Sequence, residues 1–181
     1  MGAALRILKI GFFCSLSIQS WATTVDVGEL SYSLSTSPDE ASVVGRASGS
    51  LSKDITIPDS ITVSGTTYSV ISVANNAFEN DGLETVTLGA SVTSIGNASF
   101  LGNSLTSVVI PDGVTQIQGF AFLDNELTSV TFGSGLTSIG DGSFVRNSLA
   151  SVVIPDGVTE IQSFAFRSNS LTSVTFGSGL T

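Results

Sequence analysis

Apolar and polar residues recur with a period of 22 over the second half of the chain. A phenylalanine marks each period, at Phe78, Phe100, Phe122, Phe144 and Phe166. Four segments of this length begin with leucine, at residues 83–104, 105–126, 127–148 and 149–170, and a fifth begins at Leu171 and stops at Thr181. A fixed period of this size predicts a short supersecondary unit that buries its apolar side only by stacking on copies of itself. The pattern therefore predicts a repeat protein whose function lies on a surface.

Each copy contains two extended stretches and a bend. In the second copy, Leu105, Val108 and Ile110 form the first stretch, and the apolar pair Val114 and Ile117 forms the second. Turn residues separate the two stretches, as Pro111-Asp112-Gly113 in one copy and Gly133-Ser134-Gly135 in the next. We expect a coil with two extended sides and a tight corner, filled by the periodic phenylalanine. Successive copies differ and then repeat in pairs, so the sequence period is 44, which indicates duplication of a double unit.

An asparagine follows each ring by three residues. The positions are Asn103, Asn125, Asn147 and Asn169, with Asp81 in the first copy. A side-chain amide repeated at a bend can satisfy backbone N–H and C=O groups of its own and the neighbouring coil. We expect these residues to form a structural ladder rather than a binding site.

Residues 23–54 do not fit the repeat. Their apolar positions alternate with a period of two on both sides of Gly28-Glu29, which predicts a hairpin, and a second short strand is expected from Ser42 to Arg46. Because a solenoid needs an atypical unit to cover its open end, we interpret 23–54 as an N-terminal cap; a disordered tether is the alternative. The solenoid is predicted over 55–181, with extra residues around Gly65-Thr66-Thr67.

Residues 1–22 have the features of a signal peptide. Arg6 and Lys9 precede an apolar run from Ile10 to Ile18, and small residues lead to a predicted cleavage after Ala22. The run is shorter than the roughly 20 residues that a membrane-spanning helix needs, and no later stretch comes closer. We therefore predict a secreted or cell-surface protein without a membrane span after cleavage; a lipoprotein anchored at Cys14 is the alternative.

The charge balance limits the possible partners. The chain has 6 basic and 15 acidic residues, no histidine, and a net charge of −9. Clustered Lys and Arg are needed to bind nucleic acids or anionic lipid surfaces, so neither is expected as a partner. Cleavage would also remove the single cysteine, which excludes disulfides and thiolate metal sites from the mature chain.

Few residues suggest chemistry. Without histidine the chain lacks the commonest general base and metal ligand. Asp112 and Asp156 recur at equivalent corners two coils apart, about 10 Å on the strand spacing, so a glycan hydrolase with two acids is a third hypothesis. The acidic residues are too scattered for a calcium loop. We predict no catalytic, cofactor-binding or metal-binding residues, no cofactor, and no enzyme activity.

The outward residues of the first stretch form the candidate binding face. They are uncharged, mostly hydroxyl-bearing and β-branched: Thr85, Thr87, Ser107, Val109, Ser129, Thr131, Ser151, Val153, Ser173 and Thr175. Such residues suit parallel strands whatever the function. Solenoids, however, also present extended surfaces to partners, so this face is the candidate site for an extracellular protein or glycan.

The consensus L-x-x-V-x-I-P-x-x-V-x-x-I-x-x-x-A-F-x-x-N, from Asp54 to Thr181, resembles the BspA-like or treponemal-class leucine-rich repeat family. This chain differs from the usual pattern in having asparagine where cysteine is common and 22 residues where 23 is frequent. The resemblance implies a repeat solenoid, mainly β, coiled right-handedly with short parallel strands on two sides, little or no regular helix and a β-rich N-terminal start. It also implies secreted or cell-surface proteins of bacteria and some protists, with adhesion to host or neighbouring-cell proteins and no shared catalytic residues.

Two main functional hypotheses follow. The first is a secreted or cell-surface, non-catalytic adhesion module that binds a protein or glycan. The second is a structural spacer or surface-layer repeat without a specific ligand. The sequence stops halfway through a coil at Leu180-Thr181, which indicates a fragment and predicts self-association through an open coil.

Overall fold

The structure is a computed structural model that describes residues 23–35 and 38–180. The predicted signal peptide, its cleavage after Ala22 and the alternative anchor at Cys14 lie outside the described residues. All regular elements in the described part are strands, and this part contains no helix long and apolar enough to cross a membrane.

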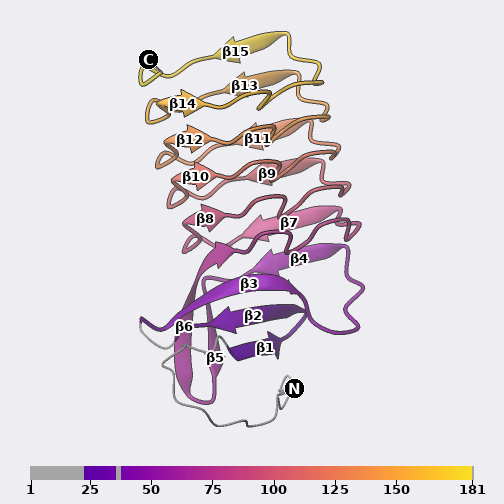
Figure 1. The fold of residues 1–181 in the computed structure, drawn as a ribbon, viewed down its shortest axis with the longest axis vertical. Coiled ribbons are helices and arrows are strands. Elements are labelled where there is room, and N and C mark those ends of the chain that lie inside the picture. The colour runs from indigo at the N-terminus through magenta and orange to yellow at the C-terminus, as the bar shows by residue number, and fades with distance from the viewer. Residues whose placement is uncertain (1–22, 36–37, 181) are drawn as a thin grey trace, which may run out of the picture.

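The chain forms a stack of coils that rises from an N-terminal sheet (Figure 1). One side of the stack contains β4 (Asp54–Ile57), β7 (Thr85–Leu88), β9 (Ser107–Val109), β11 (Ser129–Thr131), β13 (Ser151–Val153) and β15 (Ser173–Thr175). The other side contains β6 (Thr66–Val73), β8 (Ser94–Ile95), β10 (Gln116–Ile117), β12 (Ser138–Ile139) and β14 (Glu160–Ile161), which pair in this order and in parallel. The predicted β solenoid with short parallel strands on two sides is confirmed.

The N-terminal cap is a small sheet that continues into the solenoid. Strands β1 (Thr23–Val27) and β2 (Leu30–Leu34) form the predicted antiparallel hairpin, and β2 pairs in the same sense with β3 (Glu40–Arg46). The predicted start of this third strand at Ser42 is wrong by two residues. Strand β3 begins earlier because it also pairs in parallel with β6, starting with Glu40 opposite Ser69. This pairing continues the sheet of β1, β2 and β3 into the first coil, which is the arrangement expected of an N-terminal cap.

The extra residues of the first, irregular copy form a hairpin. Strand β5 (Ser60–Val63) pairs antiparallel with β6. Ser64 and Gly65 at the turn have φ values of 52° and 88°, and positive φ at both central residues is the geometry that two-residue hairpin turns need. The insertion around Gly65 therefore lengthens β6, the strand that pairs with the cap. The 22-residue coils that follow are unchanged.

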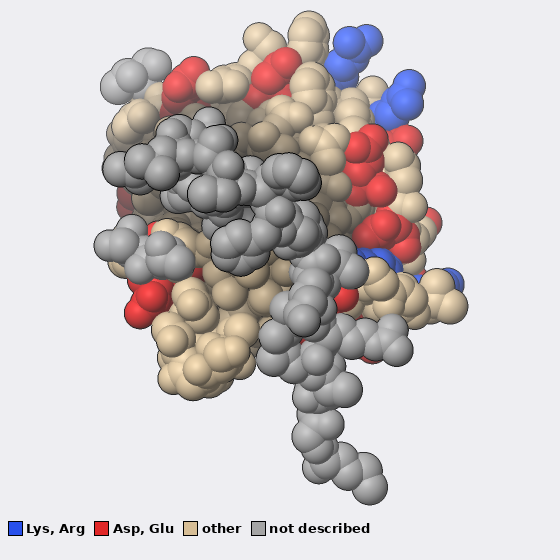
Figure 2. All heavy atoms as spheres, turned by 60° about the horizontal axis from the view of Figure 1, so that its bottom comes forward, with Lys and Arg blue, Asp and Glu red and all other residues tan. Residues whose placement is uncertain are grey.

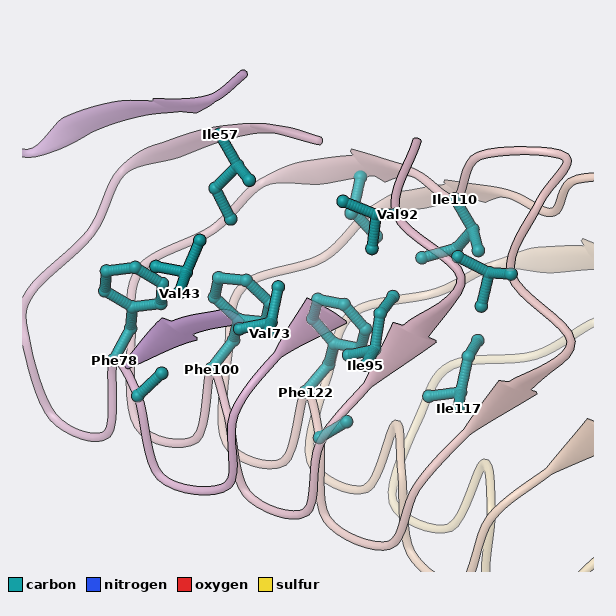
Figure 3. Close-up of a cluster of buried hydrophobic side chains, with 14 of the residues drawn as sticks. Val43, Ile57, Val73, Phe78, Val92, Ile95, Phe100, Ile110, Ile117 and Phe122 are labelled. Atoms are coloured by element: carbon teal, nitrogen blue, oxygen red, sulfur yellow. The ribbon is translucent and has the colours of Figure 1, made fainter. Parts of the chain in front are cut away.

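A column of stacked phenylalanine rings runs through the interior. Phe78, Phe100, Phe122 and Phe144 have no exposed surface, and the ring centroids of neighbours in this column lie 5.2 to 5.4 Å apart. Their planes deviate by 13° at most. Figure 3 shows three of these rings in line, with aliphatic side chains from both strand sides packed against them. Such a column combines burial of aromatic surface with ring stacking.

The predicted inward columns are buried in the regular coils. The leucines that open each coil, at 83, 105, 127 and 149, have no exposed surface, and the second stretch is equally enclosed at Val92, Val114, Leu136 and Val158. The columns of the first strand side are less uniform, because Val86, Leu88, Val130 and Phe132 are only partly buried. Two predicted core residues of the last strand are exposed. Val174 is 38% exposed and Phe176 is 62% exposed, because β15 is the last strand of the stack and no described coil covers it.

The asparagine ladder joins each coil to the one before it. Asn103 accepts the backbone N–H of Leu83 at 2.8 Å through its Oδ1 and donates from Nδ2 to the carbonyl oxygens of Phe78 and Phe100, at 2.8 and 2.9 Å. Corresponding bonds recur at Asn125, Asn147 and Asn169. The first three asparagines of the ladder are buried, so the amides satisfy backbone groups that water cannot reach. The predicted structural role of the asparagines is confirmed.

Arg46 closes this ladder at the cap. Asp81 occupies the asparagine position of the first copy, where no preceding coil offers a partner of the same kind. The guanidinium of Arg46 donates to a carboxylate oxygen and to the backbone oxygen of Asp81, both at 3.0 Å, and also to the backbone oxygen of Ser52. A salt bridge from β3 thus replaces the amide contacts found between later coils.

The coils are associated in pairs. On the first side the strands pair in parallel as β4 with β7, β9 with β11, and β13 with β15, with no ladder between β7 and β9 or between β11 and β13. The corners explain the pairing. A Cβ at Gly135 would overlap the backbone oxygen of Asp112 within a pair, whereas a Cβ at Gly113, the equivalent position between pairs, would lie 3.2 Å from its nearest atom, the backbone oxygen of Val92. Only glycine permits this approach within a pair, so the 44-residue unit of the sequence is also a unit of the structure.

Candidate binding surfaces

The candidate binding face lies on the first side of the stack. All ten predicted residues are exposed there, on strands β7, β9, β11, β13 and β15. Val109 and Val153 are the most apolar members, and each is 65% exposed. Because the inward residues of the same strands fill the core, the structure brings the ten outward residues, none of which is charged, together on one side of the stack.

A shallow groove crosses this face at one of the two places where the strand ladder is interrupted. Its lining includes Val86 and Leu88 from the β7 coil, Val109 and Pro111 from the β9 coil, and Phe132 beyond β11. These side chains are apolar, but the polar residues Thr87, Ser107, Thr131 and Asp112 also line the groove. The groove therefore combines apolar side chains with a few polar groups, the composition usual for binding sites of small ligands and chain segments.

The two carboxylates of the hydrolase hypothesis support the corners of the coils. Asp112 accepts the backbone N–H and the hydroxyl of Ser134 in the next coil, at 2.8 and 3.1 Å. Asp156 binds Ser178 in the same way, at 2.8 and 3.2 Å. The backbone hydrogen bond from Ser134, followed by its hydroxyl bond, holds the pKa of Asp112 below its usual value. Each carboxylate thus holds the next coil at a corner, and the lowered pKa of Asp112 does not suit a general acid.

The remaining charges of the described residues are not gathered into a metal-binding cluster. Among residues 23–35 and 38–180, no group of three or more Asp, Glu, Cys or His side chains is placed to hold an ion. In the view from the cap end, carboxylates stand at several separate places (Figure 2). Lys53 pairs with Glu84 on the surface, and the hydrogen bond to that carboxylate raises the pKa of the lysine.

A second surface, which the sequence analysis did not identify, follows the second strand side. Phe120 and Phe164 occupy the same position in alternate coils, two residues before the core ring, and they are 39% and 63% exposed. Both have a left-handed backbone, with φ of 57° and 58°. For a bulky side chain this conformation costs about 1–3 kcal/mol and is a genuine outlier. The equivalent positions carry Asn76, Ala98 and Gly142, smaller residues.

Two arginines lie at the same bend. The guanidinium of Arg167 stands over the ring of Phe164, 5.2 Å from its centroid. The backbone N–H of Arg146, in the preceding coil, donates to the carbonyl of Arg167 at 3.0 Å. Within the described part of the chain, the ion pairs within 4.0 Å are Arg46 with Asp81 and Lys53 with Glu84. The other two arginines there have no carboxylate at that distance.

A signal for this surface was present in the sequence. The dipeptides Gly119-Phe120 and Ser163-Phe164 place an extra phenylalanine outside every inward column, 44 residues apart. A large apolar residue that recurs out of phase with the core indicates an exposed role. Its left-handed backbone, in contrast, follows from the bend of the coil and could not be inferred from the residue type.

Comparison with known proteins agrees with the architecture. The protein-family model described as "BspA type Leucine rich repeat region" matches residues 71–181 in six copies. The crystal structure of the T. pallidum leucine-rich repeat protein TpLRR is similar, with a TM-score of 0.65 and 28% identity over 81% of this chain and 68% of that chain. No curated protein sequence matches.

Two further structures share the fold. The pneumococcal vaccine antigen PcpA has a TM-score of 0.69 and 20% identity, over 89% of this chain and 51% of that chain. A leucine-rich repeat protein from Bacteroides capillosus has a TM-score of 0.50 and 23% identity, over 84% of this chain and 97% of that chain. Because the six matched copies cover more than half of the sequence, the protein belongs to the BspA-type leucine-rich repeat family.

Proposed function

We propose that this protein is a secreted or cell-surface adhesion module that binds an extracellular protein or glycan through the face of Thr85, Thr87, Ser107, Val109, Ser129, Thr131, Ser151, Val153, Ser173 and Thr175. The observation that carries the proposal is the exposure of Val109 and Val153, each 65% exposed among the outward residues of the first strand side. Burial of such side chains by a partner gives about 25 cal/mol for each Å² of apolar surface, while the neighbouring hydroxyls supply directional contacts.

The same face argues against a simple spacer. A spacer needs only a soluble exterior, and the column of Val109 and Val153 could then be threonine, as it is at Thr87, Thr131 and Thr175. Exposed β-branched apolar residues beside an apolar groove are a cost to solubility that binding would offset. The predicted leader at residues 1–22 supports export, and the engagement of both corner aspartates with the next coil supports a function without catalysis.

A binding screen tests the proposal. The full chain is applied to an array of glycans and to purified extracellular-matrix proteins, together with a variant carrying Ser107→Arg, Ser129→Arg and Ser151→Arg. These residues stand on three successive coils of the face, so we expect the bulky charges to reduce binding to any captured ligand at least tenfold.

The control variant carries the same charge change on the other side of the stack, as Ser94→Arg, Gln116→Arg and Ser138→Arg on β8, β10 and β12. It should bind as the unmodified chain does. Equal binding by all three proteins would remove this face as the site, and a complete lack of ligands across the screen would favour the spacer. Turnover of any arrayed glycan would support the hydrolase instead.

A further inference from the structure

We propose that Phe120, Arg146, Phe164 and Arg167 form a second binding site, which takes a linear glycan containing acidic sugars. These four residues belong to three successive coils, and the site lies at the bend after the second strand side, away from the face proposed above. The inference does not depend on that face.

The two aromatic rings are placed at a cost to the fold. Phe120 and Phe164 have the left-handed backbone that Asn76 and Gly142 adopt at the same bend without difficulty. The ring of Phe120 also lies against the next coil, where a Cβ at Gly142 would come within 2.8 Å of the ring atom Cε1. The ring thus covers a glycine and remains 39% exposed. A strained residue that leaves much of its apolar surface in water indicates a functional role.

The arginines supply the charge that a ligand must match. Arg146 and Arg167 lie on adjacent coils, next to each other through the bond from the N–H of Arg146 to the carbonyl of Arg167. The other two cations of the described chain, Arg46 and Lys53, are neutralised by Asp81 and Glu84. Guanidinium groups bind carboxylates with two parallel hydrogen bonds. Asp124 and Asp141 belong to the same bend, where their backbones bond to those of Val145 and Phe120, but neither forms an ion pair with these arginines, so each guanidinium is available to a carboxylate-bearing ligand.

The spacing favours a sugar polymer. Phe120 and Phe164 recur after two coils, about 10 Å on the strand spacing, which is comparable to the length of two linked sugar rings. The C–H face of a pyranose stacks on an aromatic ring, and a uronic acid presents its carboxylate at the edge of the sugar. A net charge of −9 repels densely charged polyanions, so the ligand is a glycan with acidic sugars separated by neutral ones.

A pair of matched hexasaccharides tests the inference. A hyaluronan hexasaccharide alternates glucuronic acid with N-acetylglucosamine, and chitohexaose has N-acetylglucosamine throughout. We expect titration calorimetry of the full chain to show binding of the first, at least tenfold tighter than of the second. The double variant Phe120→Asn, Phe164→Asn and the double variant Arg146→Gln, Arg167→Gln should each weaken binding at least tenfold.

Thermal unfolding distinguishes a binding role of the rings from a structural one. Asparagine occupies the equivalent position at Asn76, so the Phe120→Asn, Phe164→Asn variant should unfold at the same temperature as the unmodified chain or a higher one. Unfolding at a clearly lower temperature would show that the rings serve the fold and would overturn the inference. So would unchanged binding by either double variant, equal affinity for both hexasaccharides, or preference for an aspartate-rich peptide.

Two control variants complete the test. Lys53→Gln removes one positive charge from the ion pair with Glu84, outside the proposed site, and should leave hexasaccharide binding unchanged. A tenfold loss of affinity in this variant would mean that the overall charge of the protein, and not this site, holds the glycan. Val109→Thr, Val153→Thr alters the first face and should also bind normally. A loss confined to this last variant would overturn the second site and favour the first.

Discussion

Asn125 donates a hydrogen bond from Nδ2 to the backbone oxygen of Phe100, one coil earlier, at 2.8 Å. Through its Oδ1 it also accepts the N–H of Leu105 at 3.2 Å. One buried amide thus joins two coils by bonds of opposite sense, at the level of the ring column. The same hydrogen bonds recur at Asn147 and Asn169. The asparagines therefore form a continuous ladder of hydrogen bonds beside the column of rings.

Replacing Asn125 by alanine should destabilise the protein by about 1–3 kcal/mol, because the buried N–H of Leu105 loses its partner, while the carbonyl of Phe100 keeps only its bond from Asn103. Urea unfolding, followed by circular dichroism, measures the change. Gln116→Ala, at an exposed position of β10, is the control and should stay within about 0.5 kcal/mol of the unmodified chain. A loss below 1 kcal/mol at Asn125 would mean that water replaces the amide.

Truncation of a ring in the middle of the column should cost more. Phe122 has no exposed surface and stacks on both neighbours, so Phe122→Ala should destabilise by about 3–5 kcal/mol, the range for buried aromatic residues. Phe176 is 62% exposed, and Phe176→Ala should change the free energy of unfolding by about 0.5 kcal/mol or less. Similar losses at both positions in urea unfolding would contradict a core formed by the column.

The link between cap and solenoid can be tested at Arg46. The side chain of Arg46 is 13% exposed and that of Asp81 is 29% exposed, so solvent partly screens the salt bridge. Arg46→Met leaves the carboxylate of Asp81 unpaired and should cost about 2 kcal/mol. Asp81→Asn removes that charge. The double variant should therefore be less destabilised than the sum of the two single variants, in the sense of a double-mutant cycle. Strictly additive losses would show that the two residues act independently.

The periodic features of this fold were predictable because one residue type at one spacing has a single structural solution. Phe122 recurs among inward apolar residues, which predicts a buried ring, and Asn125 recurs at a bend, which predicts an amide bonded to the backbone. Both predictions are confirmed. The strands of the two sides were located for the same reason. Where the period stops, the prediction was weaker: the start of β3 at Glu40 depends on pairing with Ser69, a residue 29 positions later that no local pattern identifies.

Features that depend on contacts between coils were not predictable. The interruption of the ladder between β7 and β9 depends on how closely successive corners approach, as at Gly135 and Asp112. The left-handed backbone of Phe120 follows from the bend and contradicts the preference of the residue. The sequence contained a sign of each feature: the 44-residue alternation for the first and the phenylalanine outside the core columns for the second. The three-dimensional arrangement that results could be seen only in the structure.

The corner aspartate predicts a response to acid. The hydrogen bonds from Ser134 lower the pKa of Asp112 in the folded chain, so the folded state favours the ionised carboxylate more than the unfolded state does. This contribution is complete above the unfolded pKa and is lost as the pH falls through the lower, folded value. Asp112→Asn keeps an acceptor for the N–H of Ser134 and has no charge, so its stability should fall less steeply below pH 4.

Acid unfolding of the two proteins between about pH 2 and pH 5 gives the comparison. Asp124 is an exposed carboxylate at the opposite bend, and Asp124→Asn is the matched control. Parallel stability curves for the unmodified chain and the Asp112→Asn variant would contradict a role of the corner bond in the acid response.

Ser143 offers a site where a smaller change should stabilise the fold. The side chain has no exposed surface and its hydroxyl has no hydrogen-bond partner, whereas Ala121, one coil earlier in the same column, is equally buried without a polar group. An unpaired buried hydroxyl costs about 1–3 kcal/mol, so Ser143→Ala should raise the midpoint of urea unfolding. The reverse change, Ala121→Ser, introduces the same unpaired group and should lower it by a similar amount. A loss of stability in Ser143→Ala would show that the hydroxyl has a hydrogen-bond partner. The serines of alternate coils in this column would then stabilise the fold.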